Sequence, residues 1–154
     1  MSLGRADAAR RPVMMRLGGL AGVLALAVVT AAPAFAQAGG LAIELNQVAD
    51  NGANCRMTYV INNGTGVEIS TASYEMAVYG KDGTVAKLVV LDFGKLVPDH
   101  TQVVQFDLPD MGCKDISRIS VNDPAVACEA ATGGASTLCS DKRSLATKSG
   151  ITFN

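Results

Sequence analysis

The sequence predicts an all-β protein: an antiparallel β-sandwich of about seven short strands that follows an N-terminal signal helix. Three observations predict this fold. From residue 41 onward, short segments alternate between apolar and polar residues, as strands with one buried face do. Turn residues separate these segments at roughly 10-residue intervals, which is typical of antiparallel sandwiches. No segment beyond residue 36 shows a sustained 3.6-residue period, so long amphipathic helices are not expected.

Residues 1–36 have the features of a secretory signal peptide. A positively charged stretch precedes an apolar run of 13 residues, 17–29. Ala34-Phe35-Ala36 then places small residues on either side of one position, as signal peptidase requires. The mature protein is therefore expected to begin at Gln37.

Two questions about export remain open: whether the apolar segment is cleaved, and which export route the protein takes. No charged residue occurs between Arg16 and Glu44, so the apolar segment is also compatible with an uncleaved N-terminal anchor. Arg10-Arg11 allows the twin-arginine export route beside general secretion, although Pro12-Val13-Met14 does not continue the twin-arginine pattern.

The mature chain, residues 37–154, is expected to be one mildly acidic domain. Removal of residues 1–36 takes away four arginines and one aspartate, which leaves 9 Lys+Arg against 13 Asp+Glu and a net charge of −4. This charge keeps a small exported domain soluble and does not attract nucleic acid or anionic membranes. We therefore expect no nucleic-acid partner, and no membrane partner after signal cleavage.

The first half of the mature chain contains the clearest strands. The apolar residues that alternate onto one face are Leu41, Ile43 and Leu45 in the first strand, Cys55, Met57, Tyr59 and Ile61 in the second, and Tyr74, Met76 and Val78 in the third. Asn62 to Gly66 forms a turn between the second and third strands. The third strand ends at Gly80-Lys81-Asp82-Gly83, where Asp-Gly predicts a hairpin.

The second half continues the pattern less regularly. The returning strand, 84–93, contains a continuous apolar run from Leu88 to Leu91. A turn at 96–100 leads into a strand at 101–108, and Ile119 and Val121 mark another strand. The C-terminal segment, 151–154, is either a last internal strand or an exposed strand that docks on another protein. We favour internal pairing, which would bury Phe153.

Two segments resemble the small exported immunoglobulin-like domains of bacteria known as FxLYD domains. One is Tyr-Val-Ile-Asn-Asn at 59–63, before a Gly-rich turn, and the other is Tyr-Glu-Met-Ala-Val-Tyr at 74–79, before Lys-Asp-Gly. Where that family has Phe-x-Leu-Tyr-Asp and Leu-x-Pro-Gly, this chain has Met-Ala-Val-Tyr-Gly at 76–80 and Leu-Val-Pro-Asp at 96–99. The resemblance covers about residues 55–108. The chain also resembles small exported proteins of alphaproteobacteria. The first likeness implies an immunoglobulin-like sandwich, and neither likeness implies a catalytic site.

The cysteines predict two disulfides, because an exported chain with an even number of them is expected to pair them. The four are Cys55, Cys113, Cys128 and Cys139, and their spacings of 58, 15 and 11 leave three pairings open. No pair has the Cys-x-x-Cys spacing of zinc or thioredoxin-like redox sites. The immunoglobulin-like resemblance implies that the second strand pairs with 101–108, which would bring Cys113 to Cys55. Cys128 and Cys139 would then close the loop 129–138.

Catalytic and metal-binding residues are not expected. The single histidine, His100, follows Asp99 in a turn, and adjacent side chains are poorly placed for a catalytic relay. Copper ligands would have to come from His100 and the methionines. Met57 and Met76 are expected in the core, so only Met111 is left to bind copper together with His100. Three aspartates, Asp107, Asp110 and Asp115, lack the dense spacing of a calcium loop. Asn63-Gly64-Thr65 matches a glycosylation sequon but reads as a turn only.

These observations lead to a functional hypothesis without a ligand. The protein is expected to be an exported periplasmic or secreted, non-enzymatic binding or accessory module that needs no cofactor and has a protein partner in the cell envelope. One alternative is a small metal-handling protein or enzyme whose site is assembled from residues distant in sequence. Another is a membrane-anchored subunit of an envelope assembly, if the N-terminal segment is not cleaved.

Overall fold

The structure, a computed structural model, describes residues 39–154. The predicted signal segment, 1–36, and the cleavage position before Gln37 lie outside the described residues. Within residues 39–154, no helix has the length and apolar character needed to cross a membrane.

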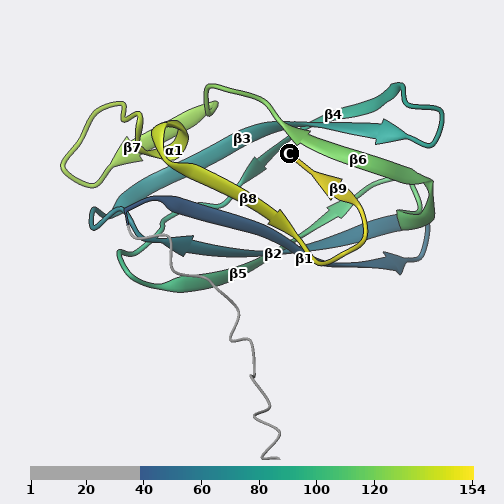
Figure 1. The fold of residues 1–154 in the computed structure, drawn as a ribbon, viewed down its shortest axis with the longest axis horizontal. Coiled ribbons are helices and arrows are strands. Elements are labelled where there is room, and N and C mark those ends of the chain that lie inside the picture. Colours follow the sequence, from purple (N-terminus) through teal and green to yellow (C-terminus); the bar gives the residue numbers. More distant parts are fainter. Residues whose placement is uncertain (1–38) are drawn as a thin grey trace, which may run out of the picture. The chain divides into compact units, whose positions relative to one another are not determined.

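Two β-sheets form the described part of the chain, which confirms the predicted all-β sandwich (Figure 1). One sheet has the strand order β5-β2-β1-β8, with bounds β1 Leu41–Asn51, β2 Asn54–Asn63, β5 Thr101–Leu108 and β8 Arg143–Thr147. The other has the order β4-β3-β6-β9, with bounds β3 Ile69–Gly80, β4 Val85–Asp92, β6 Ile116–Val121 and β9 Thr152–Phe153. A short strand, β7 (Ala127–Ala130), pairs with the first half of β3. Two single turns of helix, η1 (Cys113–Asp115) and α1 (Leu138–Asp141), lie between strands.

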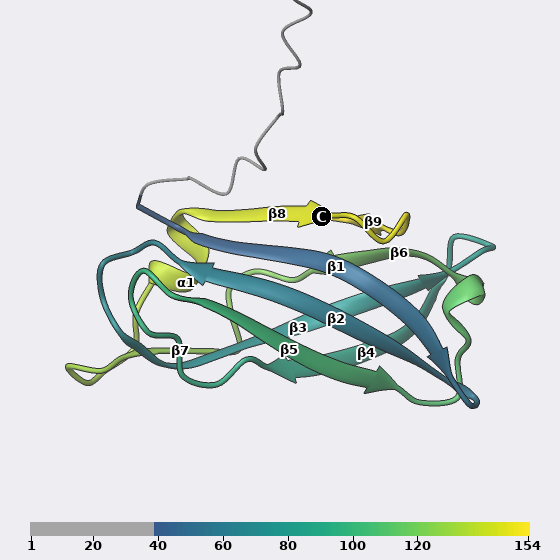
Figure 2. The same cartoon turned by 90° about the horizontal axis from the view of Figure 1, so that it is seen from below.

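The order of the first six strands is that of an immunoglobulin-like sandwich. Strands β5, β2 and β1 occupy the places of strands E, B and A, and strands β4, β3 and β6 those of C′, C and F. In Figure 2, β4 and β5 lie along one side of the sandwich, and β8 and β9 lie along the other. Strands β4 and β5 are therefore the edge strands of the two sheets on the same side.

The sandwich differs from the prediction in strand number and in two pairings. The described residues form nine strands instead of about seven, and β1–β8 and β6–β9 pair in parallel, so neither sheet is purely antiparallel. The segment expected as a loop at 129–138 begins within β7 and ends at the start of α1. Neither β7 nor β8 shows clear alternation, because β7 is Ala-Cys-Glu-Ala and β8 has Leu145 as its one large apolar residue. Pairing with longer strands holds them instead.

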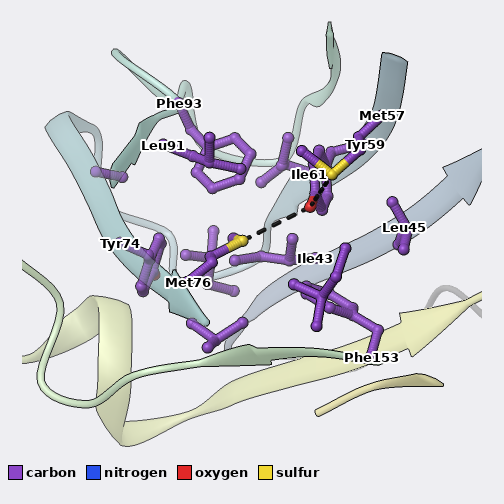
Figure 3. Close-up of a cluster of buried hydrophobic side chains, with 14 of the residues drawn as sticks. Ile43, Leu45, Met57, Tyr59, Ile61, Tyr74, Met76, Leu91, Phe93 and Phe153 are labelled. Atoms are coloured by element: carbon purple, nitrogen blue, oxygen red, sulfur yellow. Dashed lines mark hydrogen bonds between the residues drawn. The ribbon is translucent and has the colours of Figure 1, made fainter. Parts of the chain in front are cut away.

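The core lies between the sheets and contains the residues that alternation predicted. All ten residues of the three predicted faces are buried, from Leu41 in β1 to Val78 in β3. Tyr59 lies at the centre of this core, with its ring close to three phenylalanine rings: Phe93 at 5.5 Å, Phe106 at 6.0 Å and Phe153 at 5.7 Å. Figure 3 shows Tyr59 together with Phe93 and Phe153. Burial of Phe153 confirms that the C-terminal segment pairs internally, with β6.

The hairpin between β3 and β4 forms at the predicted Asp-Gly pair. Gly83 has φ +81°, which a residue with a Cβ adopts only at a cost. Asp82 stabilises the turn, because its Oδ1 accepts hydrogen bonds from the backbone N–H of Thr84 at 3.0 Å and the Thr84 hydroxyl at 2.9 Å. The turn therefore fixes where β4 begins.

Two disulfides connect the cysteines in the predicted pairs, Cys55 with Cys113 and Cys128 with Cys139. The first links the start of β2 to η1, and the second links β7 to α1. Disulfides form and persist in oxidising compartments, so they indicate an extracytoplasmic location.

Candidate functional site

His100 is an exposed turn residue, as the sequence suggested. Its Nδ1 lies 2.8 Å from the carbonyl oxygen of Pro98, and the side chain of Asp99 beside it is exposed. Met111 follows the far end of β5, whereas His100 precedes its start. The length of β5 therefore separates these two candidate copper ligands.

Replacing His100 with alanine is expected to change the free energy of unfolding by less than about 0.5 kcal/mol, since exposed positions tolerate substitution. Urea unfolding of both proteins measures the change. A large loss of stability, or the loss of bound copper on metal analysis, would show that the imidazole has a role beyond the turn.

Three further metal candidates make structural contacts. Met57 and Met76 are core residues whose sulfur atoms each lie 3.6 Å from the Tyr59 hydroxyl. Asp107 accepts two hydrogen bonds of 2.8 Å from the guanidinium of Arg56, which hold the pKa of the Asp107 carboxyl below its ordinary value. Among residues 39–154, no group of three or more His, Cys, Asp or Glu side chains could hold a metal ion.

Asn63, the first residue of the sequon, is buried and holds a turn. Its Nδ2 donates to the carbonyl oxygens of Val67 and Leu96, both at 2.9 Å. Its Oδ1 accepts hydrogen bonds from the N–H and the hydroxyl of Thr65. The turn interpretation of this sequence is therefore supported.

A surface hollow of about 450 Å³ lies beside the Cys128–Cys139 disulfide. Alanine, hydroxyl and two carboxylate side chains line it, and none of the lining residues is a histidine, lysine or arginine. The Asp141 carboxylate accepts a short hydrogen bond from Thr137.

An ion pair anchors the start of β8 to the turn before β7. The guanidinium of Arg143 donates to both carboxylate oxygens of Asp123, at 2.6 and 2.7 Å, and lies over the ring of Tyr74. These hydrogen bonds are the main cause that lowers the pKa of Asp123 from its ordinary value of 3.8. A lowered carboxyl pKa stabilises the folded state above the ordinary value, and that stabilisation disappears as the pH falls through the lower, folded value.

Asp123→Asn is therefore expected to destabilise the protein at pH 7 and to cost much less near pH 2. Asp123 is more than half exposed, so the effect is small. Urea unfolding of both proteins at the two pH values checks this. An equal cost at both would mean that the charge of Asp123 does not stabilise the fold.

Exposed apolar side chains gather on β4. Val85, Leu88 and Val90 are exposed, with exposed fractions of 59% for Leu88 and 56% for Val90. Leu88 and Val90 lie on the outer face of the sheet, whereas Val89 and Leu91 between and beyond them pack on the core. On β3, their cross-strand neighbours are Ala77 and Glu75.

The backbone groups of Leu88 and Val90 face the open side of β4. Phe93 N–H donates to Ala72 O at 2.8 Å, which makes this pair hydrogen-bonded across β3 and β4. Hydrogen-bonded and non-hydrogen-bonded pairs alternate along an antiparallel ladder, so Val89 and Leu91 bond to β3 and Leu88, Val90 and Asp92 do not. Glu75, which lies opposite Val90 on β3, is consistent with this pattern. Its carbonyl oxygen accepts a hydrogen bond from Asn122 N–H on the other side of β3, away from β4. We call Leu88 and Val90, with these outward backbone groups, the β4 edge.

Polar pairs lie beside the β4 edge, on the side of β3 and β6. Asn122 Nδ2 donates to Glu75 Oε1 at 2.6 Å, and the guanidinium of Arg118 lies 3.8 Å from the centroid of the Tyr79 ring. An apolar strip on a free sheet edge with a polar rim is typical of a surface that another protein covers. The sequence signal for it was the continuous run from Leu88 to Leu91.

Comparisons of the chain with protein-family models, with curated proteins and with solved structures found no match.

Proposed function

We propose that the protein is an exported, non-enzymatic binding module of the periplasm or the extracellular space, and that it binds a protein partner of the cell envelope through the β4 edge. The observation that carries this proposal is the coincidence of free backbone groups and exposed apolar side chains at Leu88 and Val90. An added strand would satisfy the first and cover the second. The resemblance to small exported immunoglobulin-like domains supports the same class of function.

The chemistry of the β4 edge suits association better than catalysis. The outer side chains of its two residues are aliphatic, and its polar groups are backbone N–H and C=O. Such groups pair with an extended chain but do not transfer protons or attack a substrate. The edge of the other sheet is more polar, because Val103 on β5 stands between Thr101 and Gln105 on the same face.

Substitution at the β4 edge tests this function. Leu88→Lys together with Val90→Lys is expected to abolish chemical crosslinks to a partner in envelope extract. Val103→Lys is a matched control, since Val103 is 62% exposed and lies on the edge strand β5. Partner crosslinks that survive the double substitution, or that disappear with Val103→Lys, would remove the β4 edge from the proposal.

N-terminal sequencing of the protein from the cell envelope tests export. Cleavage after Ala36 should give a chain that starts at Gln37 and separates from membranes. A chain that retains residues 17–29 and stays with membranes would instead support the anchored subunit of an envelope assembly. Metal analysis of the same preparation tests the alternative of a metal-handling protein, which requires bound metal in the purified protein.

A further inference from the structure

We infer that the β4 edge is covered by β4 of a second copy of this chain, paired antiparallel about a two-fold axis beside Val89. This pairing would join the two copies of the sheet β4-β3-β6-β9 into one continuous sheet. The inference rests on the proposed function of the β4 edge and names its occupant.

The free backbone groups of β4 fit each other in one register. A continuous antiparallel sheet requires that directly opposed residues lie on the same face. With Val89 on the axis, Leu88 of one copy opposes Val90 of the other, and each such pair exchanges both of its backbone hydrogen bonds. A shift by two residues would draw in Ala86, which lies at the register irregularity between β3 and β4, or would oppose Leu88 to Asp92. The register about Val89 opposes the two exposed residues to each other and leaves Ala86 opposite Asp92 only at the two ends of the pairing.

The side chains are also complementary in this register. Leu88 and Val90 of both copies would form one aliphatic cluster on the outer face, over Ala77 of each β3. The side-chain surface of Leu88 and Val90 that is exposed in the single chain would then be covered by the other copy.

Charge favours the antiparallel arrangement. The charged residues of β4 are Lys87 near its start and Asp92 at its end. Antiparallel pairing brings the Lys87 end of one copy near the Asp92 end of the other, with the two side chains on opposite faces of the sheet, whereas parallel pairing in register would place each charge beside its like. On β5, by contrast, Asp107 is already paired with Arg56 of its own chain.

Sedimentation velocity of the exported full-length gene product tests self-association. The unchanged protein should show a monomer–dimer equilibrium. Leu88→Lys should weaken the dimer by about 30-fold or more, because a two-fold interface carries each substitution twice. Val103→Lys should leave the equilibrium unchanged. A monomer at all concentrations up to the solubility limit, or a dimer that only Val103→Lys disrupts, would overturn the inference.

An engineered thiol tests the register, since both native cysteine pairs are closed as disulfides. Val89→Cys would face its own copy across the axis at a separation that suits a disulfide. It should therefore give a covalent dimer on air oxidation. Lys87→Cys would stand about 14 Å from its copy and should not crosslink. Crosslinking of Lys87→Cys but not of Val89→Cys would contradict this pairing.

A photo-crosslinker separates this inference from the function on which it rests. With p-benzoylphenylalanine at position 88, irradiation in cells should give an adduct of twice the mass of the mature chain. An adduct of any other mass would overturn self-pairing and retain the β4 edge as a binding site. No adduct at position 88 would overturn both.

Discussion

Replacing Tyr59 with alanine is expected to lower the free energy of unfolding by about 4 kcal/mol, the usual cost of truncating a fully buried aromatic side chain. Tyr59 has no exposed surface, and its ring packs against rings from the β4–β5 connection, β5 and β9. Its removal would therefore loosen both sheets at once. Urea unfolding followed by circular dichroism measures the loss.

Phenylalanine at two tyrosine positions provides the controls. The Tyr59 hydroxyl contacts the sulfur atoms of Met57 and Met76, which are weak acceptors, so Tyr59→Phe should cost less than about 1 kcal/mol. The Tyr74 hydroxyl donates to Cys139 O at 2.8 Å, and Tyr74→Phe would leave that buried carbonyl without this donor at a cost of about 1–2 kcal/mol. If Tyr59→Phe were as costly as Tyr59→Ala, ring packing would not be the main contribution of Tyr59.

Removing the Cys55–Cys113 disulfide is expected to destabilise the protein by about 4 kcal/mol, against about 3 kcal/mol for Cys128–Cys139. The bridges close loops with sequence separations of 58 and 11, and the longer closed loop restricts the unfolded chain more strongly. The paired substitutions Cys55→Ala/Cys113→Ala and Cys128→Ala/Cys139→Ala leave no free thiol. Urea unfolding of both variants compares the two losses.

The reverse order of cost would point to a different origin of the stabilisation. In that case the shorter bridge would act chiefly by holding β7 and α1 in their folded positions. The contribution of the bridge to the free energy of unfolding would then come more from ordering that segment in the folded state than from restricting the unfolded chain.

The long strands could be predicted because each buries one face. Leu41, Ile43 and Leu45 alternate with polar or small residues, and so do the core residues of β2. The Asp82-Gly83 turn could be predicted because its backbone conformation favours glycine. The disulfide pairing followed from the antiparallel contact of β2 with β5, which the immunoglobulin-like resemblance implied.

The short strands could not be predicted because their own residues do not determine them. In β8, Arg143 is held by Asp123 and by pairing with β1, and neither contact leaves a periodic pattern. In β7, Cys128 is held by its disulfide and by β3. Parallel pairing with β1 likewise depends on where the chain returns after α1.

The β4 edge was only partly visible in the sequence. The run from Leu88 to Leu91 indicates a strand with apolar side chains on both faces. Such a run does not distinguish a strand that exposes one apolar face from a strand that is buried on both faces. The side chains of Leu88 and Val90 are exposed because they lie on the outer face of the sheet, and their backbone groups are free because β4 stands at the end of the sheet. Strand order is a property of the whole fold, so local sequence could not reveal this surface.

Residue-resolved amide hydrogen exchange on β4 tests the central claim most directly, that the protein binds through the β4 edge. In dilute protein, the amides of Val89 and Leu91 should be protected by β3, and those of Leu88 and Val90 should exchange rapidly. As the protein concentration rises, or as envelope extract is added, Leu88 and Val90 should become protected while Val103 on β5 stays unchanged. If Leu88 and Val90 exchange rapidly under every condition, the β4 edge is not a binding surface.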